Sequence, residues 1–249
     1  MSAIVPFAIV LRDAGHPNAD AIRRAFRTFH HLTDADAIRL AANAQGILMR
    51  QLGGDEARAL QQALVKEGVN AVLVKEEDLR LLPASRLVQR LDLSAGEIII
   101  TDSQGRVNPV KWSQFTLVAA GAVPHVEVEA TSLQQSPLWG RWTKPESPRS
   151  RLTTGQHLVL ELIVAPDQLR YEIQAHRFPF QFVLDQPTAS LTEKFVWLTR
   201  ELTRHAPHVQ LNRGAADIRD GVALVRGYPS RQAMLDEMTW LLWSRAQGQ

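Results

Sequence analysis

The chain of 249 residues contains no cysteine, and this absence removes several classes of protein at once. Without thiols there can be no disulfide bond, thiolate nucleophile, iron–sulfur cluster or cysteine-ligated zinc. A cysteine-free chain fits a reducing compartment, although secreted proteins can also lack cysteine. With 45% hydrophobic and 22% charged residues, the composition is that of an ordinary globular protein. Collagen-like, coiled-coil and disordered proteins are therefore excluded.

Long apolar segments are missing as well. The longest early apolar run covers residues 3–10, has no basic residue before it and is followed by Arg12 and Asp13. A secretory signal needs a basic start and small residues at its cleavage site, and a membrane span needs about 18–20 apolar residues. The sequence therefore predicts a soluble, cytoplasmic protein without a membrane partner.

The common catalytic and nucleotide-binding motifs are also absent. The chain has no phosphate loop, no Gly-x-Gly-x-x-Gly turn, no Gly-x-Ser-x-Gly elbow and no His-Glu-x-x-His helix. Its eight histidines form at most pairs in the sequence, whereas a zinc site needs three or four converging ligands. The sequence therefore predicts a non-enzymatic protein with no cofactor and no metal.

The net charge of +2 comes from one segment. Residues 131–155 contain four basic residues and one acidic residue, while the two signs nearly balance elsewhere. The pI of 9.2 therefore reports a local basic segment and argues against a nucleic-acid-binding face. Because residues 131–155 have three prolines and no hydrophobic periodicity, we expect an irregular insertion or linker.

Residues 1–80 have the pattern of a small α/β module. Alternating apolar residues predict a strand at 5–12, and a second strand is expected at 69–74. Three helices with apolar stripes are expected between these strands. Their boundaries are marked by the N-cap residues Asn18 and Thr33, by Gly53-Gly54 before the third helix, and by Gly68 after it. The predicted order is strand, helix, helix, short link, helix, strand.

This order and several residues resemble the C-terminal domain of the bacterial ribosomal stalk protein, whose fold is shared by the protease adaptor of the Clp system. The matching residues are Phe26-Arg27, Leu32, Ala37, Leu40, Glu56-Ala57, Leu64 and Gly68. The resemblance covers residues 5–75. It implies a compact ferredoxin-like or stalk-like module that acts by binding other proteins.

The sequence departs from that family on the surface that contacts translation factors. The family's Gly-Leu-Gly turn is replaced by residues 30–33 (His-His-Leu-Thr), and Ala35 and Ile38 stand where lysines are expected. Arg24 and Arg27 keep positive charge on this face. The resemblance therefore implies a protein-binding module without implying that translation factors are its partners.

Residues 85–249 have a β-rich pattern followed by helices. Strands are expected at 87–93, 97–101, 107–112, 115–118, 125–128, 158–164 and 169–175. Ser190 and Glu193 form a capping-box pattern at the start of one helix, and a last helix follows Pro229. Over residues 85–205 this order resembles a bacterial pleckstrin-homology-like domain, which implies a barrel closed by a helix. The predicted fold is α+β with two domains, residues 1–80 and residues 85–249.

The leading functional hypothesis is an adaptor or scaffold that binds an unidentified protein partner. Its candidate binding residues on the first helix are Arg23, Arg24 and Arg27. A second candidate cluster consists of Trp139, Arg141 and Trp142, because tryptophan and arginine dominate binding hot spots. Whether the protein forms homo-oligomers stays open.

The alternative hypothesis is an enzyme or a small-ligand-binding protein with its site between the two domains. The residues expected there are His176, Arg177 or Glu172, on the late strand. A deep cavity with convergent polar groups would favour this alternative, and shallow grooves would favour the adaptor. A third possibility is that the basic segment 131–155 binds an anionic surface.

Overall fold

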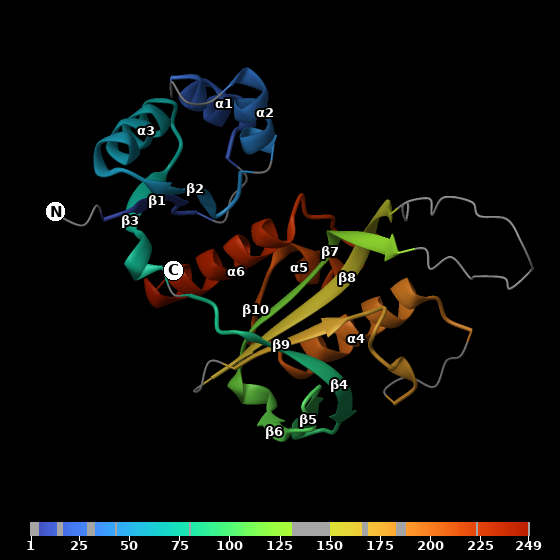
Figure 1. Cartoon of the computed structure of the whole chain (residues 1–249). Helices are drawn as coiled ribbons and strands as arrows, with labels where there is room; N and C mark the ends of the chain where they lie inside the picture. The colour runs from blue at the N-terminus through green and yellow to red at the C-terminus, as the bar shows by residue number, and fades with distance from the viewer. Residues whose placement is uncertain are drawn as a thin grey trace, which may run out of the picture.

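The computed structural model describes nine stretches of the chain, without the side chains of residues 126–130, 150–154 and 182. The stretches are 5–13, 17–28, 33–42, 44–79, 81–130, 150–165, 169–182, 188–222 and 224–248. Helices combine with two sheets, one of three strands and one of seven (Figure 1). The α+β class predicted from the sequence is therefore confirmed.

The first sheet has the strand order β2-β1-β3, and both of its pairings are antiparallel. The elements of this part are β1 (Phe7–Leu11), α1 (Ala19–Arg27), α2 (Asp34–Ala42), β2 (Ile47–Leu52), α3 (Gly54–Lys66) and β3 (Ala71–Lys75). A short link is predicted between the second and third helices of this part. That prediction is wrong, because the segment contains the edge strand β2. This strand begins with three consecutive apolar residues, 47–49, and so lacks the alternation that marks a half-buried strand.

The predicted helix boundaries in this part are confirmed. Asn18 Oδ1 accepts hydrogen bonds from the backbone N–H groups of Asp20 (2.9 Å) and Ala21 (3.3 Å). Thr33 Oγ1 accepts one from the N–H of the third residue of α2, at 3.2 Å. Such bonds satisfy N–H groups that the first helical turn leaves unpaired. Gly68 ends α3 with a φ of +78°, a conformation that glycine adopts without strain.

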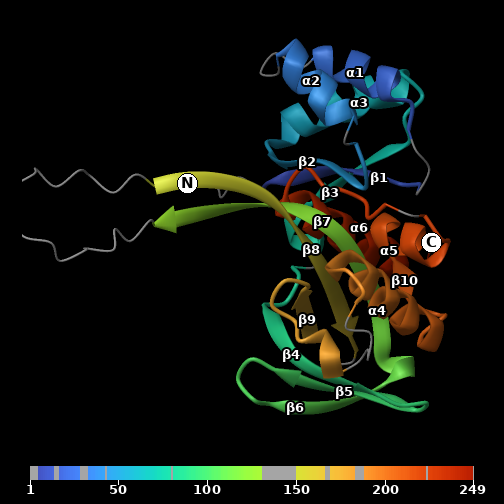
Figure 2. The ribbon, with the colours of Figure 1, turned by 90° about the vertical axis from the view of Figure 1, so that its right-hand side faces the viewer.

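The first sheet is covered by helices on both faces. The helices α1, α2 and α3 bury one apolar core against it, and the last helix, α6 (Arg231–Ala246), packs on the other face (Figure 2). Trp240 of α6 lies in a cluster with Val10 and donates its Nε1–H to the carbonyl oxygen of Leu11 at 2.8 Å. A Cβ on Gly46 would lie 2.6 Å from the Trp240 side chain, and Gly46 has a φ of +56°. Only glycine fits at position 46 beside Trp240. Gly46 therefore allows α6 to pack against the first sheet.

The second sheet has the strand order β10-β7-β8-β9-β4-β5-β6. Its strands are β4 (Ser85–Leu93), β5 (Glu97–Asp102), β6 (Val107–Lys111), β7 (Phe115–Ala130), β8 (Ser150–Val164), β9 (Leu169–Gln174) and β10 (Gln210–Leu211). The sheet ends at β10 and β6, which do not pair with each other, so the predicted barrel is wrong. The sheet does not close into a barrel, because β7 pairs with the two-residue strand β10 and not with β6. β10 was not predicted from the sequence.

The strands β7 and β8 are longer than predicted and pair along their length. The short strands expected at 115–118 and 125–128 are parts of β7, and residues 150–155 of the expected irregular segment belong to β8. Their outer parts leave the body as a two-stranded ribbon (Figure 2). The rest of the segment, 131–149, which includes Trp139, Arg141 and Trp142, lies outside the described residues.

Helices also cover both faces of the second sheet. α4 (Leu191–His205) and α5 (Arg213–Arg219), the latter not predicted, pack on one face, and α6 packs on the other. The predicted capping box starts α4, because Ser190 Oγ accepts the Glu193 N–H (3.2 Å) and Glu193 Oε2 accepts the Ser190 N–H (2.7 Å). α6 therefore lies between the two sheets (Figure 1). Among the described helices, none has the length and apolar character needed to cross a bilayer.

Candidate functional site

The three arginines predicted for protein binding lie on the outer side of α1, and each of them faces a carboxylate of the same chain. The ion pairs are Arg23–Asp20 (3.3 Å), Arg24–Glu67 (2.7 Å) and Arg27–Asp34 (2.7 Å). The hydrogen bond from Arg27 lowers the pKa of Asp34, which keeps this partner ionised. The positive charge of α1 is therefore balanced locally.

The residues of the alternative hypothesis come together on the second sheet. Glu172 and Arg177 line a cavity of about 350 Å³, and His176 packs against His157, which also lines it. No residue of 1–80 is among the lining residues of this sheet cavity. The predicted position between the domains is therefore wrong for these three residues, because Glu172 and Arg177 line a cavity beside Arg231, in the first turn of α6.

A cluster of buried charges lies beside the sheet cavity. Glu161 is fully buried and accepts hydrogen bonds from Arg170 Nε and Nη2, both at 2.9 Å, and from Arg231. Glu172 accepts a hydrogen bond from Ser85 (3.0 Å) and pairs with Arg231 (2.9 Å). Burial raises the pKa of Glu161, while the two guanidinium groups favour its charged form. The sequence signal for this cluster is a glutamate inside the apolar run 158–164.

A larger cavity, of about 470 Å³, lies between the two parts of the chain. Its walls come from α2 and β2 on one side, and from Arg213 and residues 226–236 on the other. Three arginines from separate elements line this inter-sheet cavity: Arg39, Arg213 and Arg226. Ligand sites are often cavities of about 300–1,000 Å³ at such junctions. The location is that of the alternative hypothesis, although the residues are different.

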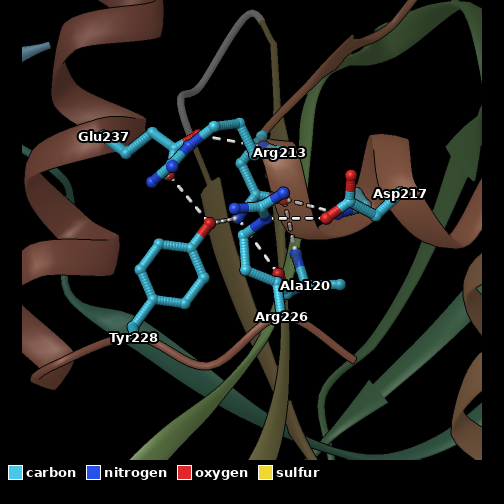
Figure 3. A network of polar contacts seen from close by, with 8 residues as sticks. Ala120, Arg213, Asp217, Arg226, Tyr228 and Glu237 are labelled. Carbon is cyan, nitrogen blue, oxygen red and sulfur yellow. Dashed lines mark hydrogen bonds and ion pairs between the residues drawn. The ribbon is translucent and has the colours of Figure 1, made fainter. Parts of the chain in front are cut away.

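A hydrogen-bond network fixes one wall of the inter-sheet cavity (Figure 3). Asn212 accepts the N–H of Ala120 (2.9 Å) and donates Nδ2–H to the Ala120 carbonyl (3.1 Å) and to the Tyr228 hydroxyl (2.7 Å). Tyr228 then donates its O–H to Glu237 Oε2 at 2.8 Å. Burial, together with the nearby Glu237 carboxylate, raises the pKa of Tyr228, so the phenol stays protonated and acts as a donor. The network links β7, α5 and α6.

The arginines Arg213 and Arg226 are held in place by carboxylates (Figure 3). Arg213 donates Nε–H and Nη2–H to Glu237, at 3.2 and 3.3 Å, and lies over the Tyr228 ring at 5.9 Å. Arg226 donates its Nε–H to Asp217 Oδ2 at 2.6 Å. Carboxylates held in this way orient the guanidinium groups before any ligand arrives.

Tyr228 fits only because β7 has a glycine beneath it. The segment before α6 runs beside β7, with hydrogen bonds from Ala122 N–H to the Arg226 carbonyl (2.9 Å) and from Tyr228 N–H to the Ala122 carbonyl (2.8 Å). A Cβ at Gly121 would lie 2.5 Å from the Tyr228 ring. Any larger residue at this position would displace the ring and the arginine that lies over it.

Two other polar groups complete the inter-sheet cavity. Asp236 of α6 lines it and pairs with Arg50 of β2 at 2.9 Å, which bridges the two parts of the chain. The Gln45 side-chain oxygen is buried at the cavity and has no hydrogen-bond partner within the described stretches. A buried acceptor without a partner is unfavourable unless a ligand or water donates to it.

Most of this inter-sheet site could not be predicted from the sequence. Its residues come from positions 39–48 and 212–237, where no repeated spacing or motif occurs. Two weak signals exist: Tyr228 is one of two tyrosines in the chain, and Glu237 stands next to Met238 in an otherwise apolar helix stripe. Within the residues that the structure describes, no group of three or more histidine, aspartate or glutamate side chains could hold a metal ion.

Comparisons with protein-family models, curated proteins and solved structures gave no match to this chain. The resemblances of residues 5–75 to the ribosomal stalk domain and of residues 85–205 to a pleckstrin-homology-like domain therefore stay predictions.

Proposed function

We propose that the protein binds a small anionic ligand in the inter-sheet cavity. The observation that carries this proposal is that Arg39, Arg213 and Arg226, from three separate segments, line one cavity of about 470 Å³. Arginine is suited to carboxylate and phosphate groups because its planar fork donates parallel hydrogen bonds.

The existing ion pairs leave donors for such a ligand. Glu237 engages Nε and Nη2 of Arg213, and Asp217 engages Nε of Arg226. The remaining Nη1 of Arg213 and both terminal nitrogens of Arg226 have no acceptor within the described stretches. The pairs therefore serve to aim the guanidinium groups, and the outer N–H groups are available to an anion.

The polar groups on the other side of the cavity favour a ligand that also carries hydrogen-bond donors. Gln45 presents a buried oxygen without a partner, and the Asp236 carboxylate lines the same space. Both accept hydrogen bonds from hydroxyl or ammonium groups. A hydroxylated or amino-substituted carboxylate or phosphate would satisfy both sides of the cavity.

Calorimetric titration of the full chain with citrate and with pyrophosphate tests the proposal. We expect binding of at least one probe, and a loss of about ten-fold or more in affinity in Arg226→Gln, because a hydrogen bond to a charged group contributes about 1.5–3 kcal/mol. Arg219→Gln is the matched control. Arg219 is also an arginine paired with an aspartate, at 2.8 Å, but it does not line the cavity.

Two results would overturn the proposal. One is the absence of binding of either probe to the wild-type chain. The other is an equal loss of affinity in Arg219→Gln and Arg226→Gln, which would indicate nonspecific attraction of anions to a basic surface.

The adaptor function is a second proposal, and the ribbon formed by β7 and β8 favours it. Residues 124–130 pair with 150–156, whereas β9 pairs with β8 over 159–164 and β10 pairs with β7 at residues 117–118. Among the residues that the structure describes, the outer ribbon therefore has two strands and no third, an arrangement that is marginally stable in water unless something packs on it. A protein partner that covers the ribbon would stabilise it.

A shortened chain tests the adaptor proposal. Replacing residues 127–153 with Asn-Gly joins Val126 to Thr154 by a tight turn and removes most of the ribbon together with Trp139, Arg141 and Trp142. We expect the full chain to capture a partner that the shortened chain does not capture. The purified partner should also bind the purified full chain. Capture of the same proteins by both chains would exclude the ribbon as the binding surface. Parallel loss in the double variant Arg24→Glu/Arg27→Glu would place the binding surface on α1 instead.

A further inference from the structure

Three histidines form a row across adjacent strands of the second sheet, at the outer end of the sheet cavity. His125 and His157 have ring centroids 4.1 Å apart, and His157 and His176 have centroids 4.0 Å apart. The row follows from the register, because His157 is paired with Val123, two residues from His125 on β7, and the pairing of Val159 with Gln174 places His176 beside His157. Alternate residues of a strand share a face, so the three rings lie on the face that α6 partly covers.

The sheet cavity next to this row contains an arginine that differs from its neighbours. Arg170 and Arg231 are both engaged with Glu161, and Arg231 also pairs with Glu172. Arg177 lines the cavity too, is exposed, and has no ion pair or side-chain hydrogen bond to the described residues. One guanidinium at the cavity is therefore uncommitted.

The charges that face the histidine row favour an anion. The titratable and charged groups are His125 of β7, His157 and Glu161 of β8, Arg170, Glu172, His176 and Arg177 of β9 and the turn after it, and Arg231 of α6. With neutral imidazoles, three arginines against two glutamates give a net charge of +1. Each protonated imidazole adds to this positive charge. Two imidazolium rings about 4 Å apart repel each other, so a bound anion would favour their protonation.

We propose that the sheet cavity is a second anion-binding site, where Arg177 and the histidine row bind an oxyanion more tightly as the pH falls. This site shares no lining residue with the inter-sheet cavity. Its ligand class is a small oxyanion such as sulfate, phosphate or a carboxylate, because guanidinium and imidazolium groups donate hydrogen bonds and do not accept them. His125 and His157 stand on strands of a sheet and His176 lies just after β9, so a rigid support holds the donors in place.

Calorimetric titration with sulfate at pH 5.5 and at pH 8.0 tests this inference. Sulfate keeps its charge over this range, so a pH dependence must come from the protein. Both the wild-type chain and the Arg226→Gln variant are measured. In this variant the anion site proposed in the inter-sheet cavity is weakened. We expect sulfate affinity to be about ten-fold higher at pH 5.5 than at pH 8.0 in both, because imidazoles gain charge between about pH 5 and 8.

Variants separate the roles of the residues. In Arg177→Gln the sulfate affinity should fall at both pH values, and in His157→Gln the difference between the two pH values should shrink. His176→Gln, at an exposed position, repeats the second test if His157→Gln fails to fold. His208→Gln is the control, because His208 is exposed and does not line the cavity.

The inference is overturned if sulfate does not bind, if its affinity is the same at both pH values, or if His208→Gln reduces the pH dependence as much as His157→Gln. Loss of citrate or pyrophosphate binding in Arg226→Gln with unchanged sulfate binding would support both sites. The reverse pattern, in which Arg226→Gln abolishes sulfate binding, would leave only the inter-sheet site.

Discussion

Two groups of arginines in this protein differ in the surroundings of their ion pairs. On α1 the side chains of Arg24 and Arg27 are 53% and 48% exposed, and their carboxylate partners lie at the surface. Beside α6, the side chain of Arg170 is 9% exposed and its partner Glu161 is fully buried. The distances are similar, at 2.7–2.9 Å, so geometry alone does not distinguish the two groups.

Burial determines how much each group of ion pairs contributes to the stability of the fold. Water screens an exposed pair, so its contribution to folding is small. A buried pair has lost hydration on both partners, which opposes its stabilising effect, although removal of one partner leaves an uncompensated charge. We therefore expect loss of the charges on α1 to change the stability of the fold little, and loss of one charge near the sheet cavity to destabilise it. Retention of buried charges that an apolar core could replace is consistent with a binding role for that cavity.

The largest expected effect is at Glu161. Glu161→Gln keeps the shape of the side chain but leaves Arg170 and Arg231 without their shared negative charge. Loss of one partner of a buried pair destabilises proteins by about 3–5 kcal/mol. We expect a loss of this size in the free energy of unfolding from urea denaturation.

A double variant provides the control for this prediction. Glu161→Leu/Arg170→Met removes both main charges and replaces them with apolar groups of similar volume. Because neither group is left charged and unpaired, this variant should be more stable than Glu161→Gln. A double variant less stable than Glu161→Gln would show that the pair itself holds the sheet together.

Asp102 represents an intermediate case, with a buried carboxylate and a half-exposed arginine. It accepts hydrogen bonds from the N–H groups of Gln104 (2.9 Å) and Arg106 (3.1 Å) and from Arg106 Nε (2.7 Å). Asp102→Asn should lower the free energy of unfolding at pH 7 by about 1–3 kcal/mol, because the charged acceptor of these bonds is lost. Urea denaturation measures this loss, and Asp92→Asn, at an exposed pair on β4, is the matched control.

The pH dependence gives the prediction for Asp102 a second check. Burial opposes ionisation of this group, but the bonds from Arg106 and Gln104 outweigh it and lower the pKa of Asp102. A carboxyl with a lower pKa in the folded state stabilises the fold above its unfolded value, about 3.9, and the stabilisation is lost as pH falls through the folded value. The difference between wild type and Asp102→Asn should therefore shrink below about pH 4. A constant difference down to pH 2 would contradict this assignment.

The elements that could be predicted from the sequence are those whose signals lie within a few residues. Asn18, Gly68 and the Ser190/Glu193 box mark helix ends through bonds within a few residues, so they could be read without knowledge of the fold. The strand β2 and the closure of the second sheet depend on pairing with distant segments. No local pattern carries that information.

The candidate sites show the same division between local and distant information. His176, Arg177 or Glu172, on the late strand, are the residues predicted for the alternative site. Glu172 and Arg177 line the sheet cavity, and His176 packs against His157 beside it. Their neighbours His125 and Arg231 come from β7 and α6, which only the folded chain brings to the same cavity. The cavity between the sheets could not be predicted from spacing, because a long segment of the chain separates Arg39 from Arg213 and Arg226.

The smallest expected effect is at the exposed pair of Arg27 and Asp34. The hydrogen bond from Arg27 lowers the pKa of Asp34, so Arg27→Gln should bring the titration of this carboxyl back toward about 3.9, as measured by NMR. Because water screens both groups, the urea midpoint at neutral pH should stay within experimental error of the wild type. Arg58→Gln, which removes another exposed arginine, should leave the Asp34 titration unchanged. If Arg27→Gln shifted the urea midpoint as much as Asp102→Asn does, burial would not be what separates the two groups of arginines.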